Sequence, residues 1–382
     1  MMKGSLQERY DTIVVGAGIA GASAAYFLHQ KGQRVLVIDK KGIAKGGSGA
    51  AGAFVSPKIG KGSALQQLTN EAFSFAKEFY LQNFPEHWHQ TGVVRIPKDE
   101  SDAEKFSSYE KYNTNKYEKL SSEVLSERGI HTPFESFCFE EAGVCDAAAL
   151  CEALLTEIDF IQLEVTDAEQ CDGVWKAGRY RAENLVLATG YENSLFDVRY
   201  MGVRGTWGTR GDFATSTQLD VSLHQSMSVS ANFDGVIKLG ATHEKLIKDP
   251  VECQDTQALG LQERAKELVE TSDFELLETF CGMRAGSKDY FPLLGSVVDV
   301  LYMLENYPKI TQGAKIKEPI KKISHLYVCN GLGGRGFVFG PLMGKMLAES
   351  IVDGREVDPR VDADRLFLKW CRRSGVGREL KL

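Results

Sequence analysis

Three glycines near the start of the chain have the spacing of a phosphate-binding turn. The segment TIVVGAGIAG places Gly16, Gly18 and Gly21 in the pattern G-x-G-x-x-G, directly after a short apolar run. In this pattern the first glycine permits a tight turn, the second admits a pyrophosphate close to the backbone, and the third packs a helix on a strand. The pattern alone also fits a glycine-rich strand–helix turn in another α/β fold.

The neighbouring residues predict the elements that would position this turn. Residues 12–18 predict a strand, and residues 19–32 predict a helix that ends at a glycine and directs its N-terminus at the phosphates. A second strand, RVLVID, ends in Asp39, 18 residues after Gly21, where a carboxylate would accept hydrogen bonds from a ribose. Together these elements favour a dinucleotide site, to which Lys40, Ser48 and Gly49 are also assigned.

Two later glycine-rich segments predict that the dinucleotide is long. RAENLVLATGYENS, residues 181–194, predicts a strand that ends at Thr189 and Gly190. HLYVCNGLGGRGFVFGPLMGKML, residues 325–347, predicts a strand, a turn and a helix, with candidate contacts at Gly331, Gly333, Gly334, Arg335, Gly336 and Phe337. FAD explains three contacts better than NAD does, because a helix N-terminus stabilises the negative charge that a reduced flavin gains. The alternative is that the late glycines only allow tight packing.

Composition limits the remaining classes. The 382 residues are 43% hydrophobic and contain no run of 18 apolar residues, and the start MMKGSLQERYDT is too polar for a secretory signal. We therefore expect no membrane association and a cytoplasmic location. The net charge of −7 gives nucleic acid no global attraction, so such a partner would need a local basic patch.

The eight cysteines are scattered without any C-x-x-C pair. This distribution predicts reduced, mostly buried thiols rather than a disulfide framework or a zinc site, and no metal is expected.

Five segments together resemble the D-amino-acid oxidase and glycine oxidase superfamily of FAD-dependent oxidoreductases. They are VVGAGIAGASAAYFLHQKGQRVLVIDK, GGSGAAGAFVSPKIGKG, NLVLATG, CGMRAGSKDYFPLLG and LYVCNGLGGRGFVFGPLMGKMLAESI, and the resemblance spans nearly the whole chain. Within the superfamily, SGAAGAFVSPKIG, GVCDAAALCEALL, DGVIKLGATHE and GLGGRGF are most similar to the FAD-dependent C-terminal modules of bifunctional enzymes of tRNA 5-methylaminomethyl-2-thiouridine biosynthesis.

The resemblance implies an α/β chain, α+β overall, in which a Rossmann-like FAD-binding domain is interleaved with a substrate-binding domain built on an antiparallel sheet. The FAD-binding domain is expected at residues 1–92, 143–200 and 278–382, and the substrate-binding domain at residues 93–142 and 201–277. The apolar spacing in residues 63–84 predicts a helix beside the FAD-binding domain, and the polar residues 98–127 predict a solvated helical excursion.

Arg284, in CGMRAGSKDYFPLLG, is the candidate catalytic residue. The resemblance implies that it anchors a substrate carboxylate, a task that suits a guanidinium because its planar fork offers two parallel donors. The alternative is a buried structural ion pair with Asp289 or Glu244.

Other polar residues near these motifs are assigned supporting roles. Arg335 is expected to orient the last turn or to contact flavin, and His243 and Tyr290 are expected to be structural. Some members of the superfamily attach flavin to a cysteine near the arginine motif. The matching position here is Gly282, with Cys281 one residue away, so we expect noncovalent FAD.

The mechanism that the resemblance implies is hydride transfer from a carbon beside an amine to FAD, followed by hydrolysis of the imine, with positioning as the main contribution of the protein. One candidate activity converts the 5-carboxymethylaminomethyl group of a tRNA wobble uridine into an aminomethyl group and glyoxylate. The second oxidises a free amine such as glycine, sarcosine or a D-amino acid. A noncatalytic FAD-binding or electron-transfer subunit is the third possibility, and the Arg284 motif speaks against it.

Two basic segments favour tRNA as a partner, because lysines and arginines contact phosphates. Residues 296–325 contain Lys309, Lys315, Lys317, Lys321 and Lys322, and residues 369–382 read KWCRRSGVGRELKL. The alternative is that both segments are solvated faces. Because the chain starts directly at the first strand, we expect no methyltransferase module in it, and a separate methyltransferase would act on the product.

Overall fold

The first apolar run forms a central strand of an eight-stranded sheet in the computed structural model, which describes residues 9–373. Strand β1 (Arg9–Val15) pairs in parallel with β2 (Val35–Asp39) on one side and with β12 (Tyr180–Leu187) on the other. Strands β9 (Asp159–Gln162) and β19 (Lys322–Asn330) extend the parallel part beyond β2 and β12. Continuous apolar runs suit these strands, because a parallel sheet is buried on both faces.

Antiparallel strands complete this sheet. Strands β10 (Ala168–Cys171) and β11 (Val174–Ala177) form a hairpin beside β12, and β18 (Leu293–Val298) pairs with β19. The α/β fold class predicted from the sequence is confirmed.

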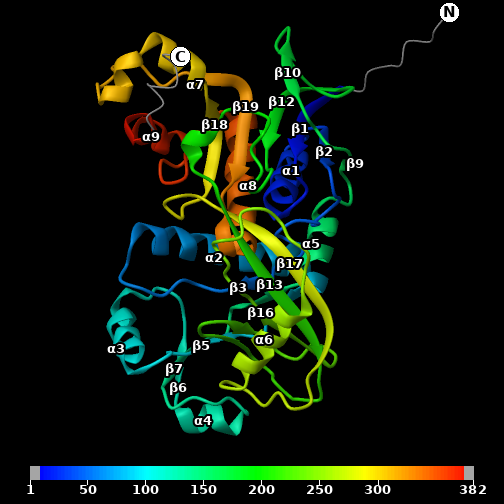
Figure 1. Cartoon of the computed structure of the whole chain (residues 1–382), viewed down its shortest axis with the longest axis vertical. Coiled ribbons are helices and arrows are strands. Elements are labelled where there is room, and N and C mark those ends of the chain that lie inside the picture. The colour runs from blue at the N-terminus through cyan, green and yellow to red at the C-terminus, as the bar shows by residue number, and fades with distance from the viewer. Residues whose placement is uncertain (1–8, 374–382) are drawn as a thin grey trace, which may run out of the picture.

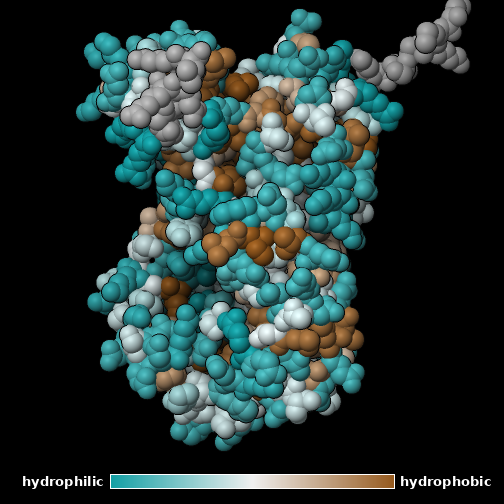
Figure 2. All heavy atoms as spheres, viewed as in Figure 1, coloured by the Kyte–Doolittle hydropathy of each residue, from teal (hydrophilic) through white to brown (hydrophobic). Residues whose placement is uncertain are grey.

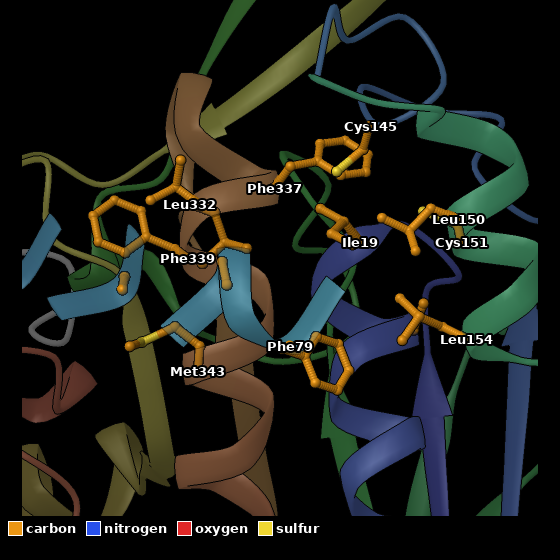
Figure 3. Close-up of a cluster of buried hydrophobic side chains, with 14 of the residues drawn as sticks. Ile19, Phe79, Cys145, Leu150, Cys151, Leu154, Leu332, Phe337, Phe339 and Met343 are labelled. Carbon is orange, nitrogen blue, oxygen red and sulfur yellow. The ribbon is translucent and has the colours of Figure 1, made fainter. Parts of the chain in front are cut away.

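Helices α1 (Ile19–Gln30) and α8 (Gly336–Asp353) pack on the sheet, α2 (Ala64–Asn83) packs against α8, and α5 (Ala147–Leu154) packs against α1. The helix predicted at residues 63–84 is thereby confirmed. Figure 3 shows apolar side chains of α5 and α8 gathered around α1, with Ile19 between them. Helices α1 and α8 approach closely because Gly344 has no side chain, and an added Cβ there would lie 2.6 Å from the backbone of Ser23.

The second lobe is built on another eight-stranded sheet, in which all pairs are antiparallel except β14 with β5 (Figure 1). In spatial order its strands are β17 (Glu275–Gly286), β13 (Arg204–Ala214), β16 (Val236–Gly240), β15 (Ser228–Val229), β14 (Ser222–His224), β5 (Val93–Arg95), β7 (Ser136–Phe139) and β6 (Glu118–Leu120). The long strands β13 and β17 run side by side from the waist of the molecule into this lobe.

The chain passes between the lobes several times. Strand β17 continues to residue 286 and therefore crosses residue 278, where the sequence places the third segment of the FAD-binding domain. The polar excursion 98–127 contains helices α3 (Glu100–Tyr109) and α4 (Ser122–Glu127), but β6 between them joins the sheet edge. The excursion is thus only partly helical.

Shorter elements connect the lobes and cover their ends. A three-stranded sheet joins β3 (Phe54–Val55), β8 (Gly143–Cys145) and β4 (Trp88–His89). The remaining α-helices are α6 (Asp255–Ala265), α7 (Val300–Asn306) and α9 (Phe367–Arg373). The 3-10 helices are η1 (Pro85–His87), η2 (Glu110–Tyr112), η3 (Arg199–Met201), η4 (Pro308–Gln312), η5 (Gly333–Arg335) and η6 (Ala363–Leu366).

The prediction of eight reduced cysteines is wrong for one pair. Cys253 and Cys281 form a disulfide, with their Cα atoms 5.6 Å apart and a sequence separation of 28. The pairing arises because the segment before α6 folds back onto β17, a tertiary contact that sequence spacing does not reveal. Of the other six cysteines, Cys171 is exposed and the rest are buried.

No helix between residues 9 and 373 combines the length and the apolar character that crossing a bilayer requires.

Candidate functional site

A cavity of about 950 Å³ lies at the junction of the two lobes. Its walls come from the turn after β1, the loop after β2, the turn after β12, strand β17 and the turn before α8. This volume is at the upper end for ligand sites, which suits an elongated ligand. Figure 2 shows a mostly hydrophilic face with a row of hydrophobic side chains across the waist between the lobes.

The first glycine turn folds as its spacing predicts. Gly16 has a φ of +110°, and a Cβ there would lie 2.3 Å from the carbonyl oxygen of Ala188, so only glycine fits. A Cβ on Gly21 would lie 1.9 Å from the carbonyl oxygen of Gly16, which places this glycine in helix–strand packing and outside the cavity wall. Gly16 and Gly18 both line the cavity.

Ser48 caps the helix that follows this turn. The N-cap position of α1 is Gly18, which has no side chain, and the Ser48 Oγ atom accepts a hydrogen bond from the amide of Ile19 at 2.9 Å. Ser48 also lines the cavity, whereas Gly49 does not and packs against the backbone of Ala44. The loop after β2 therefore completes the N-terminus of α1, which sequence order alone does not show.

Asp39 and Lys40 lie at the acidic end of the cavity. One carboxylate oxygen of Asp39 accepts a hydrogen bond from the amide of Ala17 at 2.9 Å, which ties the end of β2 to the glycine turn. Lys40 forms an ion pair with Glu192, and this pair raises the pKa of the lysine. Glu164 also lines the cavity and lies 3.7 Å from the Lys40 Nζ atom, so the carboxylates of Glu164 and Glu192 meet at this lysine.

The turn after β12 brings two more predicted residues to the wall. Thr189 and Gly190 line the cavity, and the Thr189 hydroxyl donates a hydrogen bond to the carbonyl oxygen of Glu192. The Asn330 side chain donates to the carbonyl oxygen of Gly190 at 2.8 Å and so joins the ends of β12 and β19. Asn330 also lines the cavity, although the sequence pattern did not predict it as a site residue.

The turn before α8 presents bare backbone to the cavity. All six residues predicted in this turn line it: Gly331, Gly333, Gly334, Arg335, Gly336 and Phe337. Gly331 and Gly333 have φ values of +71° and +61°, whereas a Cβ on Gly336 would lie 2.9 Å from Ile19 of α1. Gly331 and Gly333 are therefore required by the turn, whereas Gly336 is required by helix packing. The alternative that the late glycines only allow tight packing thus holds for part of the segment.

Arg284 projects from β17 into the cavity wall. Its Nη2 atom donates a hydrogen bond to the carbonyl oxygen of Thr242 at 2.7 Å, and its buried Nη1 atom has no partner among residues 9–373. Burial lowers the pKa of this guanidinium. The structural ion pair considered from the sequence does not form, because Asp289 pairs with Arg365 and Glu244 accepts a hydrogen bond from Thr242.

His243 and Tyr290, which were expected to be structural, both line the cavity. Burial and the charge of Arg284 lower the pKa of His243, which favours the neutral imidazole. Tyr290 is 76% exposed and has a φ of +68°, so its side chain is solvated at the rim. Cys281 also lines the wall, but its Sγ atom is bound to Cys253.

Several cavity residues were missed by the sequence reasoning. Lys58, Arg95, His224, Trp207 and Met283 line the wall from the loop after β3 and from β5, β14, β13 and β17. Lys58 and Met283 lie in segments that carry the resemblance but were given no role there, and Arg95, His224 and Trp207 lie in no quoted motif. Strands far apart in sequence bring the five together. The one available signal was a charged residue in the apolar stretch GVVRIP, where Arg95 sits between buried neighbours.

The charge of the cavity differs between its two ends. Asp39, Glu164 and Glu192 line the end near the first glycine turn together with Lys40, Lys41 and Lys45, while Lys58, Arg95, Arg284 and Arg335 line the end toward the second sheet without an acid. A dinucleotide fits this arrangement, with a ribose diol at the acids, a pyrophosphate at the glycine turn and an anionic or reducible group at the cations. No group of three His, Cys, Asp or Glu residues that could hold a metal occurs between residues 9 and 373.

Comparison with known proteins agrees with this geometry. Residues 11–350 match the family described as FAD dependent oxidoreductase, DAO. The tRNA 5-methylaminomethyl-2-thiouridine biosynthesis bifunctional protein MnmC of Shewanella amazonensis is 26% identical over 95% of this chain and 60% of its own length. MnmC of Leptospira interrogans is 28% identical over 90% of this chain and 57% of its own length. The chain thus spans about 60% of the length of these curated relatives.

Solved structures share the fold at lower identity. Glycine oxidase from Bacillus cereus superposes with a TM-score of 0.75 at 20% identity, covering 91% of this chain and 96% of the oxidase. Iminodiacetate oxidase from Chelativorans superposes with a TM-score of 0.70 at 19% identity, covering 91% of this chain and 97% of that enzyme.

Proposed function

This chain belongs to the DAO family of FAD-dependent oxidoreductases, and we propose that it oxidises the 5-carboxymethylaminomethyl group of a wobble uridine in tRNA. The observation that carries the proposal is Arg284, a cavity-lining guanidinium with a free donor and no carboxylate partner among the described residues. The curated relatives that cover 90–95% of the chain are named for tRNA 5-methylaminomethyl-2-thiouridine biosynthesis, which supports this substrate.

The residues of the cavity fit FAD. Asp39 would hold the ribose, Gly16 and Gly18 would admit the pyrophosphate, and the turn at 331–336 would offer its amides to the ring. We expect the cofactor to be held noncovalently, because the disulfide occupies the Cys281 sulfur. Bound FAD supplies a hydride acceptor for the substrate carbon.

The protein contributes orientation to the reaction. The Nη1 atom of Arg284 would donate to the carboxylate of the N–CH2–COO⁻ group, which fixes the methylene carbon relative to the cavity wall. Loss of a hydride from this carbon gives the C=N bond of an imine. Water then adds to the imine carbon, and cleavage of the C–N bond releases glyoxylate and leaves the aminomethyl group on the uridine. His243, neutral beside Arg284, adds no charge that would compete for the carboxylate.

A basic surface supports contact with tRNA. Helix α9 packs against η4, and a Cβ on Gly313 would lie 3.5 Å from the Cδ atom of Arg372, so the two basic segments meet at one corner of the upper lobe (Figure 1). The exposed basic residues of these segments are Lys309, Lys315, Lys317, Lys321, Lys369, Arg372 and Arg373. Lys322 instead pairs with Asp362 and Asp364. Residues 374–382 lie outside the described part of the chain.

The proposed product requires one further reaction, and its tRNA substrate implies a cellular location. The aminomethyl product would be methylated by a methyltransferase, and the reaction would take place in the cytoplasm with the tRNA pool. The relatives are named for a methylaminomethyl product, which has one methyl group more than the aminomethyl product, and this supports a methyltransferase as partner.

A second activity has its own support. The glycine oxidase fold covers 91% of this chain, and Arg284 would equally hold the carboxylate of a free amino acid or of sarcosine. A noncatalytic FAD-binding or electron-transfer subunit is less well supported, because such a protein would not need an unpaired buried guanidinium in its cavity.

The test is anaerobic reduction of the flavin in the purified holoprotein. Separate samples receive glycine, sarcosine and tRNA that carries 5-carboxymethylaminomethyl-2-thiouridine, and the flavin absorbance, the released glyoxylate and the nucleoside mass are followed. Bleaching with tRNA and conversion to the aminomethyl nucleoside would support the proposal. Bleaching with the free amines alone would replace it with the amino-acid oxidase activity.

A further inference from the structure

A second group of cations lies in the cavity, apart from Arg284. Arg95 comes from β5, Lys58 from the loop after β3, and Arg335 from the turn before α8, and all three line the cavity wall. Arg335 donates a hydrogen bond from Nη1 to the carbonyl oxygen of Ser56 at 3.1 Å, which holds it against the loop that carries Lys58.

No acid balances these three charges. Among residues 9–373, no carboxylate lies within the 4.0 Å ion-pair distance of Arg95, Lys58 or Arg335. Within the described part of the chain, the buried Nε atom of Arg95 has no hydrogen-bond partner, and the Lys58 Nζ atom has none either. Asp102 is the one acid whose charge reaches Arg95, and it lies beyond ion-pair distance.

The three side chains are close enough to act on one another. Burial lowers the pKa of Arg95 to about 9, with the charge of Arg335 adding to the effect, and burial lowers that of Arg335 to about 10. Burial and the charges of Arg335 and Arg95 likewise lower the pKa of Lys58. Arg95 and Arg335 remain charged at neutral pH, so like charges converge on one part of the wall.

The neighbouring histidine, His224, adds no charge to this group. His224 pairs with Arg95 across β14 and β5, and its Nδ1 atom lies 2.7 Å from the Ser228 hydroxyl. Burial and the charges of Arg95 and Arg335 place the pKa of His224 well below its usual value, so the imidazole is neutral.

Arg95 is separate from Arg284 in the second sheet, whereas the turn that carries Arg335 borders Arg284, since a Cβ on Gly334 would lie 3.9 Å from the Arg284 Cδ atom. Arg284 is on β17, the first strand of the sheet, whereas Arg95 is on β5, with β13, β16, β15 and β14 between them. A carboxylate held by Arg284 therefore leaves the Arg95 group free for another part of the same ligand.

Partly buried cations without counter-ions are costly, because desolvation removes some of the water that would stabilise each charge. We propose that Arg95, Lys58 and Arg335 form a second anion subsite, which binds an anionic group of the substrate other than the carboxylate at Arg284. The subsite takes a phosphate or a second carboxylate. This assignment rests on the proposed tRNA function, under which the bound phosphate is the one next to the modified uridine.

The experiment compares substrates that differ only in the second anion. Holoprotein is reduced anaerobically with 5-carboxymethylaminomethyluridine and with its 5′- and 3′-monophosphates, and in a second pair with sarcosine and iminodiacetate. One charge-assisted contact predicts a half-saturating concentration roughly 10- to 100-fold lower for the preferred dianion. Arg95→Gln and Lys58→Gln should each reduce that preference, and Lys61→Gln, an exposed lysine outside the cavity, should preserve it.

The outcomes separate the two sources and the two proposals. A lost preference for a monophosphate identifies the phosphate, and a lost preference for iminodiacetate identifies a second carboxylate. In the latter case the tRNA function fails while the subsite stands. If the wild-type protein shows no preference for either dianion, or if Arg95→Gln weakens both members of each pair equally, the subsite is overturned. Unchanged tRNA turnover in both variants would overturn it while leaving the tRNA function intact.

Folding is monitored through the flavin spectrum and the thermal unfolding midpoint. If Arg95→Gln does not fold, Lys58→Gln alone still decides, because Lys58 is on a loop and its Nζ atom contributes no hydrogen bond to the fold.

Discussion

Arg284 and Thr242 hold each other across the cavity wall: the guanidinium donates to the backbone carbonyl at 2.7 Å with one terminal nitrogen and leaves the other without a partner. The bond fixes the direction of the side chain, and the free nitrogen is the donor available to a ligand. Positioning and recognition therefore rest on different atoms of the same group.

Arg284→Ala should yield flavin-loaded protein with poor substrate use. Removing the charge-assisted contact to a carboxylate is expected to lower kcat/KM by roughly 100-fold. The measurement is the anaerobic reduction rate against substrate concentration, with the flavin spectrum as the check on folding. Retained activity toward carboxylate-bearing substrates would show that another residue is the anchor.

Gly208→Ala tests the position of Arg284 without touching its charge. A Cβ at Gly208 on β13 would lie 1.7 Å from the Arg284 Nη2 atom, so the guanidinium must leave its place beside Thr242. We expect a higher KM and a flavin content equal to that of the wild type. Gly260→Ala, on α6 with open space around it, is the matched control and should leave KM unchanged.

Gly18→Val should reduce flavin loading. The added side chain would point at the Ser48 Oγ atom, 2.9 Å from the Cβ position, and would crowd both the pyrophosphate space and the cap of α1. Ser48→Ala removes the cap without adding bulk and should lower the free energy of unfolding by about 1 kcal/mol. The ratio of flavin to protein absorbance is the readout, and full loading of Gly18→Val would refute the phosphate role of this turn.

Protein stability should fall as the pH drops below about 6.5, the pKa of an unfolded histidine. Burial, together with the charges of Arg95, Arg335, Lys98 and His243, keeps the pKa of His224 far below this value. The unfolded chain therefore binds a proton that the native chain does not bind. This lowers the free energy of unfolding by about 1.4 kcal/mol per pH unit until the native pKa of His224 is reached.

His224→Asn should flatten this part of the pH profile, measured by denaturant unfolding between pH 7 and 5, roughly the window in which histidine titrates. The exposed His131→Asn is the control and should keep the wild-type slope. An equal slope in His224→Asn would assign the acid sensitivity to other groups.

Reduction of the Cys253–Cys281 disulfide should destabilise the protein. Closing a loop of 28 residues limits the unfolded chain and contributes roughly 3–4 kcal/mol. Thiol counting in denaturant, with and without reductant, checks that two extra thiols appear. Cys253→Ser should reproduce the lower unfolding free energy, while Cys171→Ser, which changes an exposed free thiol, should not.

The local parts of the fold and site could be predicted from the sequence. The turn at Gly16 and the end of β2 at Asp39 are set by neighbouring residues, because short-range glycine spacing and apolar periodicity decide them. Other features depend on contacts between distant segments. Ser48 caps α1 from another loop, and Gly336 packs on Ile19, so spacing alone assigned both of them only to the cofactor.

Arg95 and Lys58 escaped prediction for the same reason, whereas Arg335 was predicted with the last glycine turn. Arg95 and Lys58 are ordinary charged residues in sequence, and their significance appears only when β5 and the loop after β3 face one cavity without an acid nearby. The disulfide is similar, since Cys253 reaches Cys281 through a fold-back that no motif encodes.

The excursion from residue 92 to residue 142 begins and ends at one point, where the amide of Gly92 donates to the carbonyl oxygen of Ala142 at 2.9 Å. A segment with adjacent ends can be exchanged for another without moving the chain on either side of it. Arg95 travels with this segment, whereas the dinucleotide turn does not. Exchange of this segment would therefore replace one of the three cations of the second anion subsite, while Lys58, Arg335 and the dinucleotide turn stay in place.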